Sequence, residues 1–123
     1  MGKESIIEQK SFQFALDVIV LYQKLRDERE YILSKQLLRS GTSIGANVEE
    51  GESAQSRKDF IAKMSVAKKE ARETRYWLRL LRKSNLVTTD VTRELTAANE
   101  LLRILTSIVK TAVENPEPPA QSG

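Results

Sequence analysis

The 123-residue sequence contains neither cysteine nor histidine. The absence of cysteine excludes disulfides, thiolate nucleophiles and thiolate metal ligands, and it fits a reducing compartment. The absence of histidine excludes Ser-His and Cys-His catalytic pairs, most zinc sites and the Glu-x-x-His ligands of di-iron bundles. Any catalysis by this chain would therefore depend on carboxylates, lysine, tyrosine or serine alone.

Long apolar runs are missing as well. The longest, Val18 to Tyr22, is far shorter than the ~18 apolar residues that a membrane-spanning helix needs. The first ten residues carry charges at Lys3, Glu4, Glu8 and Lys10, which is unlike a signal peptide or a membrane anchor. We therefore expect a soluble, cytoplasmic protein without membrane contact.

Aromatic residues are scarce, at 6%, whereas hydrophobic residues make up 40% of the chain. This composition predicts one domain with a core built mainly of Leu, Ile, Val and Ala. A domain of this size buries a limited share of its surface, so self-association is a natural way to increase burial.

Apolar residues recur at spacings of three and four in four segments, and no strand pattern is evident. The predicted fold is all-α, an antiparallel up-and-down four-helix bundle spanning residues 11–114, with helices at approximately 11–28, 30–51, 57–84 and 90–114. Residues 1–10 are predicted to be an N-terminal extension. Residues 115–123 are predicted to be a disordered tail, because Asn115-Pro116 ends the last helix.

Several polar residues are placed to cap these helices. Ser56 and Asp59 form a predicted capping box for the third helix, and Asn85 tolerates the left-handed conformation that ends it. Either Thr88 or Thr89 is expected to cap the fourth helix.

The segment from Ser40 to Asn47 has two interpretations, because it is poor in helix-forming residues. As a loop it would resemble a glycine-rich phosphate cradle, but it matches neither GxxxxGK[ST] nor GxGxxG. As a helix it would let a neighbouring backbone approach closely, with Asn47 forming a hydrogen bond across the seam. We favour the helix.

The first helix has two apolar stripes. Phe14, Val18, Leu21 and Leu25 form the predicted core stripe. A second stripe beside it suggests a subunit interface, since one bundle covers only about half of each helix. Its residues are Phe12, Ala15, Ile19 and Tyr22. The alternative is a core helix that is slightly too hydrophobic.

Positive charge is concentrated in the third helix. Between Arg57 and Lys83 there are ten basic and three acidic residues, a net charge of +7, whereas the whole chain carries only +3. The rest of the chain therefore carries −4.

Five of these cations recur at 4-3-4-3 spacing, which predicts a single basic stripe away from the packed Ala67/Ala71/Leu78 seam. We refer to Lys68, Arg72, Arg75, Arg79 and Arg82 as the basic stripe. Such a stripe predicts phosphate binding, with Tyr76 able to stack on a base. The full predicted nucleic-acid-binding set is Lys68, Lys69, Arg72, Arg75, Tyr76, Arg79, Arg82 and Lys83.

The alternative is a solvated face that acids from other helices or subunits neutralise, a common role for charge runs. The acids considered for this role are Glu28, Glu30, Glu49, Glu50 and Glu52.

Acidic residues also cluster, and they suggest either a metal or acid/base site or simple salt bridges. The residues concerned are Glu49, Glu50, Glu52, Glu70 and Glu73. Without histidine the first interpretation lacks its usual partner, so we favour salt bridges to the basic helix. Trp77 is expected to belong to the core or an interface. No catalytic residue, metal site or cofactor is predicted.

One long spaced pattern runs through the second and third helices. With x for any residue, it reads Glu30-Tyr31-x-Leu33-x-x-Gln36-Leu37-x-Arg39-x-x-x-Ser43-Ile44-x-x-Asn47-Val48-x-Glu50-Gly51, then Asp59-Phe60, then Lys69-Glu70-x-x-Glu73-Thr74-x-Tyr76-Trp77-Leu78. Over about Phe12 to Ala112, the chain resembles bacterial four-helix bundle proteins first named for open reading frames within 23S rRNA intervening sequences. Many of these proteins carry Pro where this chain has Gly45.

The resemblance implies a homopentamer without known enzymatic activity. It assigns no catalytic residue, and it makes a structural motif of Ser43, Asn47, Glu50, Gly51, Glu70, Glu73 and Trp77. The chain is also similar to the accessory variability protein of diversity-generating retroelements, a basic pentamer that binds nucleic acid and a reverse transcriptase.

We therefore predict a non-enzymatic homo-oligomeric bundle that binds RNA or DNA through the basic outer face of its third helix. The alternative is a protein–protein interaction scaffold whose basic helix pairs with an acidic partner or a neighbouring subunit.

Overall fold

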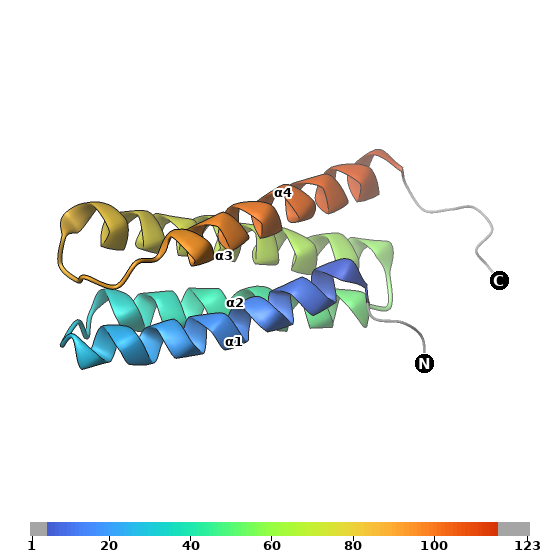
Figure 1. Cartoon of the computed structure of the whole chain (residues 1–123). Coiled ribbons are helices and arrows are strands. Elements are labelled where there is room, and N and C mark those ends of the chain that lie inside the picture. Colours follow the sequence, from blue (N-terminus) through green and yellow to red (C-terminus); the bar gives the residue numbers. More distant parts are fainter. Residues whose placement is uncertain (1–4, 116–123) are drawn as a thin grey trace.

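The computed structural model describes residues 5–115, which form four helices and no strand. The helices are α1 (Ile6–Asp27), α2 (Leu33–Glu52), α3 (Arg57–Ser84) and α4 (Thr92–Glu114). Figure 1 shows them side by side in one bundle, with successive helices running in opposite directions. The predicted antiparallel four-helix architecture is confirmed.

Each helix packs against two others. The contacting pairs are α1 with α2, α2 with α3, α3 with α4, and α1 with α4, so α1 and α3 lie on one diagonal of the bundle. Within residues 5–115, no helix is both long enough and apolar enough to cross a membrane.

The predicted ends of α3 are confirmed, although Ser56 and Asp59 form only one of the two hydrogen bonds of a capping box. Its N-cap Ser56 accepts a hydrogen bond from the backbone N–H of Asp59 at 3.1 Å, which supplies a partner for an otherwise unpaired first-turn donor. Asn85 ends the helix in the left-handed conformation, with φ of 60°.

The start of α1 differs from the prediction. The helix begins at Ile6 rather than at residue 11, because Ser5 and Glu8 form a capping box. Ser5 Oγ accepts from the Glu8 N–H at 3.2 Å, and Glu8 Oε1 accepts from the Ser5 N–H at 2.9 Å. Half of the predicted N-terminal extension is thus helical. The predicted tail after Asn115 lies outside the described residues.

The starts of α2 and α4 also differ by a few residues, because carboxylates cap them from outside the helix. Glu30 accepts from the backbone N–H groups of Leu33 and Ser34 at 2.9 and 2.7 Å, so α2 begins at Leu33 rather than residue 30. Asp90 accepts from the Thr92 N–H at 2.9 Å, so the predicted threonine cap of α4 was wrong.

The core follows the predicted stripes. Buried apolar side chains include Phe14, Val18, Leu21 and Leu25 of α1, Met64, Ala67, Ala71, Leu78 and Leu81 of α3, and Leu95, Ala98, Leu102, Leu105 and Ala112 of α4. Interdigitation of these three faces with Leu37, Ile44 and Val48 of α2 gives one continuous core.

The segment from Ser40 to Asn47 is helical, as predicted. Small residues there bring α2 close to α1: a Cβ on Gly45 would lie 3.3 Å from the Ser11 carbonyl oxygen. The predicted cross-seam hydrogen bond of Asn47 was wrong, because its Nδ2 donates to the Ser43 carbonyl of the same helix at 2.9 Å. Thr74 and Ser40 instead join α3 and α2, with their hydroxyls 2.8 Å apart.

One carboxylate ties the two turns at one end of the bundle together. Glu28, directly after α1, accepts hydrogen bonds from the backbone N–H groups of Thr88 and Thr89 at 2.7 and 2.9 Å, and from both hydroxyls. These bonds, led by the one from the Thr89 hydroxyl, lower the pKa of Glu28. We refer to this contact as the Glu28 latch.

We predict that Glu28→Gln lowers the melting temperature at neutral pH, because an amide has one acceptor atom fewer and no charge. A lowered pKa in the folded state means that the carboxylate contributes fully above its ordinary value of 4.5 and loses this contribution as the pH falls further. Melting curves from about pH 7 to pH 3 should therefore converge for the two proteins. If the difference between the melting temperatures of the two proteins is as large at about pH 3 as at about pH 7, the Glu28 latch is contradicted. Glu114→Gln, at an exposed site, controls for general charge effects.

Candidate nucleic-acid interface

The predicted nucleic-acid-binding residues all lie on α3 and reach solvent. Lys68 and Arg75 are half-buried, and the other six are exposed. The structure contains five ion pairs within residues 5–115, and none of them involves a cation of the basic stripe, Lys69 or Lys83. The positive charge of α3 is therefore unneutralised over most of its length.

Four of the five acids considered as neutralising partners are engaged elsewhere. Glu28 forms the latch, and Glu30 caps α2. Glu50 pairs with Lys63 at 2.7 Å, and Glu52 accepts a hydrogen bond from Ser5 Oγ at 2.8 Å. The predicted salt bridge to α3 is thus confirmed for Glu50, but at a lysine outside the basic stripe.

The charge of Arg82, a stripe residue, acts on the carboxyl group of Asp90. The Asp90 pKa is lowered mainly by hydrogen bonds from the side chain and backbone of Thr92, and the Arg82 charge adds a smaller effect. No ion pair joins the two side chains in the described part of the chain.

Three residues of the basic stripe border α4, so this part of the stripe lies beside a helix contact rather than on the predicted outer face. Arg75, Arg79 and Arg82 line a depression of about 320 Å³ together with Leu95 and Asn99 of α4. Arg75 and Asn99 also line an adjoining depression of about 640 Å³. The two depressions share Arg75 and Asn99, and together we call them the α3–α4 groove.

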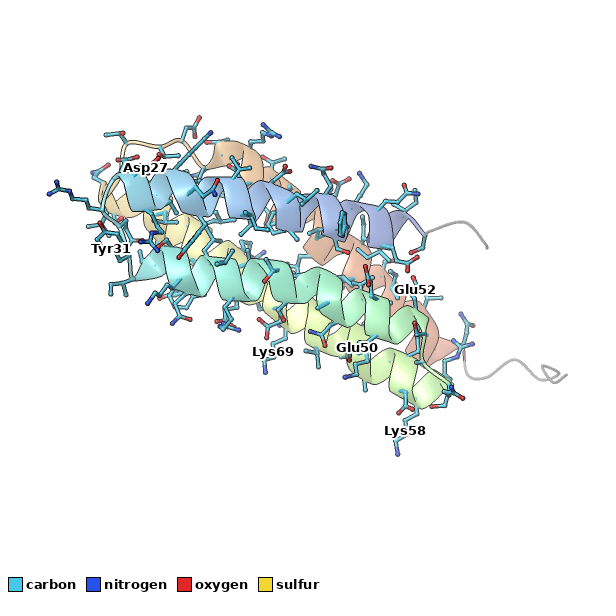
Figure 2. The ribbon with its side chains drawn as sticks, turned by 90° about the horizontal axis from the view of Figure 1, so that it is seen from below. Asp27, Tyr31, Glu50, Glu52, Lys58 and Lys69 are labelled. Carbon is cyan, nitrogen blue, oxygen red and sulfur yellow. The ribbon has the colours of Figure 1, made fainter. Side chains whose placement is uncertain are left out.

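The predicted set therefore divides between two sides of α3. Figure 2 shows Lys69 and Lys58 pointing outward from the bundle. Tyr76 is 50% exposed and makes an edge contact with Trp77, with ring centroids 5.4 Å apart. Since Tyr76 is seven residues from Lys69, it shares the outer side with that lysine rather than the groove.

The second wall of the groove was not predicted. It comes from α4 and contains Asn99, Arg103, Thr106 and Lys110, together with Leu102 and Ser107. The first four recur at 4-3-4 spacing, the same signal that identified the stripe on α3. The signal was missed because α4 contains three basic and three acidic residues and so has no net charge.

The residues of the family-like motif lie along the seam between α2 and α3. Arg39 of α2 pairs with Glu70 at 3.3 Å and with Glu73, both of α3, and Trp77 Nε1 donates to Glu73 at 3.3 Å. Gly51 keeps this seam narrow, because a Cβ there would lie 3.1 Å from Met64 Cε. Ser43 and Asn47 are hydrogen-bonded within α2.

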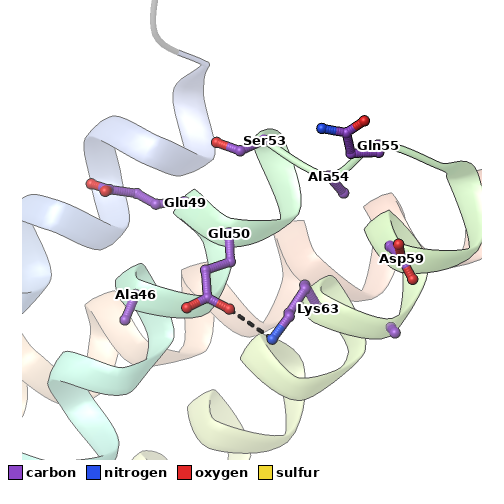
Figure 3. A pocket seen from close by; sticks show the side chains of 9 residues that line it. Ala46, Glu49, Glu50, Ser53, Ala54, Gln55, Asp59 and Lys63 are labelled. Atoms are coloured by element: carbon purple, nitrogen blue, oxygen red, sulfur yellow. Dashed lines mark ion pairs between the residues drawn. The ribbon is translucent and has the colours of Figure 1, made fainter.

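An acidic hollow lies at the turn between α2 and α3. Figure 3 shows Glu49, Glu50 and Asp59 around it, with the Glu50–Lys63 ion pair on one side. No group of three or more acidic side chains within residues 5–115 is arranged to hold a metal ion. Of these three acids, Glu50 forms a salt bridge, to Lys63.

The outer side of α1 is apolar and largely uncovered. Phe12 is 58% exposed and Ile19 is 41% exposed, whereas Ala15 and Tyr22 are half-buried. Leu16 and Val20 extend the same exposed surface. We refer to Phe12, Leu16, Ile19 and Val20 as the α1 apolar face.

We predict that Arg39→Met destabilises the fold by about 1–2 kcal/mol, because Glu70, only 9% exposed, loses the charge that compensates it. Adding Glu70→Gln to this variant should recover part of the loss by removing the isolated charge. Urea unfolding measures both effects, with exposed Lys35→Met on the same helix as the matched control. A double variant no more stable than Arg39→Met contradicts the assignment.

Comparisons with known proteins agree with this architecture. The family model described as 23S rRNA-intervening sequence protein matches residues 3–107. A crystal structure from Bacteroides thetaiotaomicron, described as a protein with unknown function from the S23 ribosomal protein family, is 45% identical and superimposes with a TM-score of 0.81. The alignment covers 85% of this chain and 99% of the other. No curated protein matches the chain. The chain belongs to the 23S rRNA-intervening sequence protein family.

Proposed function

We propose that this protein is a non-enzymatic homo-oligomer that binds RNA or DNA in the cytoplasm through the basic stripe of α3. The observation that carries the proposal is the set of accessible cations without an ion-pair partner in the described chain. Like charges at spacings of three and four weaken a helix, so a bound polyanion relieves a repulsion that the fold itself leaves in place.

The chemistry of the stripe favours the phosphate backbone over the bases. Four of its five residues are arginines, whose guanidinium groups form two parallel hydrogen bonds to one phosphate. Phosphate contacts carry no direct sequence information, so this interface binds with little sequence preference and with strong salt dependence.

We predict that Arg72→Glu/Arg75→Glu/Arg79→Glu abolishes binding, because three attractive contacts become repulsive. Fluorescence anisotropy with structured RNA and with duplex DNA, across a salt series, measures the loss. Circular dichroism should show an unchanged helical fold, since these side chains take part in no ion pair.

The matched control is Lys24→Glu/Lys35→Glu/Lys58→Glu, which changes the net charge equally at exposed sites away from the stripe. It should weaken binding far less. Equal losses would show that only total charge matters. A wild-type protein that binds neither nucleic acid at low salt contradicts the proposal and favours a protein partner. That partner would be an acidic protein or, as the resemblance implies, a reverse transcriptase.

We further propose that copies of the chain associate through the α1 apolar face, with the pentamer implied by the family resemblance as the expected assembly. Asp17 is the only charged residue between Lys10 and Lys24, and it lies on the α4 side of α1, near Arg93. An uncharged face with several exposed large side chains is typical of a protein–protein contact.

We predict that Phe12→Glu/Ile19→Glu converts the oligomer to a monomer, because each copy would then have to bury charge in the contact. Light scattering coupled to size-exclusion chromatography gives the mass in solution. Val113→Glu, at a position of similar exposure on α4, should leave the assembly intact. A monomeric wild type, or an oligomer that survives the double change, contradicts this interface.

A further inference from the structure

Resting on the proposed function, we infer that the α3–α4 groove holds one single strand of nucleic acid, with cations from both helices on its phosphates. Arg75, Arg79 and Arg82 provide one wall, and Arg103 and Lys110 provide the other. The binding site then lies at the boundary between α3 and α4 rather than on the outer face of α3.

The groove is uniformly favourable to an anion. Its lining contains five cations and no carboxylate. The remaining polar side chains are neutral, and the amide of Asn99 lies where both depressions meet. This amide has no hydrogen-bond partner within residues 5–115 and can serve a phosphate or a base edge.

The two sides of α4 also differ in charge. On its other side, Glu100 pairs with Lys10 of α1 at 3.2 Å, and Arg93 lies 3.9 Å from Asp17 of α1. Arg103 and Lys110 take part in none of the ion pairs of the described chain. Glu100, the one acid of α4 with an ion pair in the described chain, thus faces away from the groove, and Arg103 and Lys110 line it.

The dimensions favour a single strand over a duplex. From Leu95 to Lys110 the α4 wall rises about 22 Å, enough for several consecutive phosphates. The two walls belong to helices whose axes lie roughly 8–10 Å apart, whereas the two phosphate backbones of a duplex lie on either side of a major groove about 12 Å wide. Two rows of cations this close together converge on one phosphate backbone, which favours a single strand.

The test uses Arg103→Gln/Lys110→Gln, which removes two cations from α4 and leaves α3 unchanged. The probe is an unstructured RNA or DNA of about ten nucleotides, which covers a single groove. Each phosphate contact contributes about 0.7 to the slope of log K against log salt for a single strand, so five cations predict a wild-type slope near −3.5. The variant should bind severalfold more weakly and its slope should become about 1.4 shallower.

Two further variants make this result specific. Lys35→Gln/Lys58→Gln removes the same charge at exposed sites outside the groove and should leave the slope unchanged. Lys69→Gln/Lys83→Gln reduces the charge on the outer side of α3 and should weaken binding less than the α4 variant does.

The outcomes separate the inference from the proposed function. If wild type binds and the α4 variant binds equally well, or if the Lys69/Lys83 variant loses more, binding through α3 survives and the groove is overturned. Tighter binding of a duplex of the same sequence also overturns the groove. If wild type binds no nucleic acid at low salt, both proposals fall.

Discussion

The contact between Arg39 and the two carboxylates of α3 determines much of the electrostatics of this bundle. Helix α3 contains only three acids, and Asp59 lies in its first turn, where it favours the positive end of the helix. The other two, Glu70 and Glu73, lie on the side of α3 that faces α2, where Arg39 compensates their charge. The acids of α3 are thus engaged at the contact with α2 or in the first turn of α3, and the α3 residues that line the boundary with α4 include cations and no carboxylate.

Helix periodicity was enough to predict the architecture, because each stripe of apolar residues required cover from a neighbour. The helix starts were less predictable, since contacts of single polar side chains decided them. The stripe of α1 passes through Ser11, a buried polar residue, and this interruption made Ile7 look like part of an extension. Ser11 is buried because Gly45 brings the backbone of α2 against it, a tertiary contact that local sequence does not reveal.

Only the α3 part of the candidate site was predictable, because the α4 part depends on how the two helices pack. Spacing placed five cations on one side of α3, but the direction of that side depends on how α3 is rotated against α4. The second wall required knowing that Arg103 and Lys110 lie beside Arg75 across an antiparallel pair. Because α4 contains as many acidic as basic residues, its net charge gives no sign of these two cations. Only the packed structure shows that Arg103 and Lys110 lie on one side of the helix.

The diagonal placement of α1 and α3 has a consequence for valency. An assembly joined through the α1 apolar face keeps the opposite corner of every copy accessible, so each subunit added repeats the same groove at the rim. A strand that leaves one groove meets the next at the effective concentration set by the linking nucleotides, rather than at its bulk concentration. Contacts that are weak in one copy then combine into avidity that rises with the length of the nucleic acid. Such an assembly binds long strands more tightly than short ones, whereas the affinity of a single groove depends only on the few phosphates that it contacts.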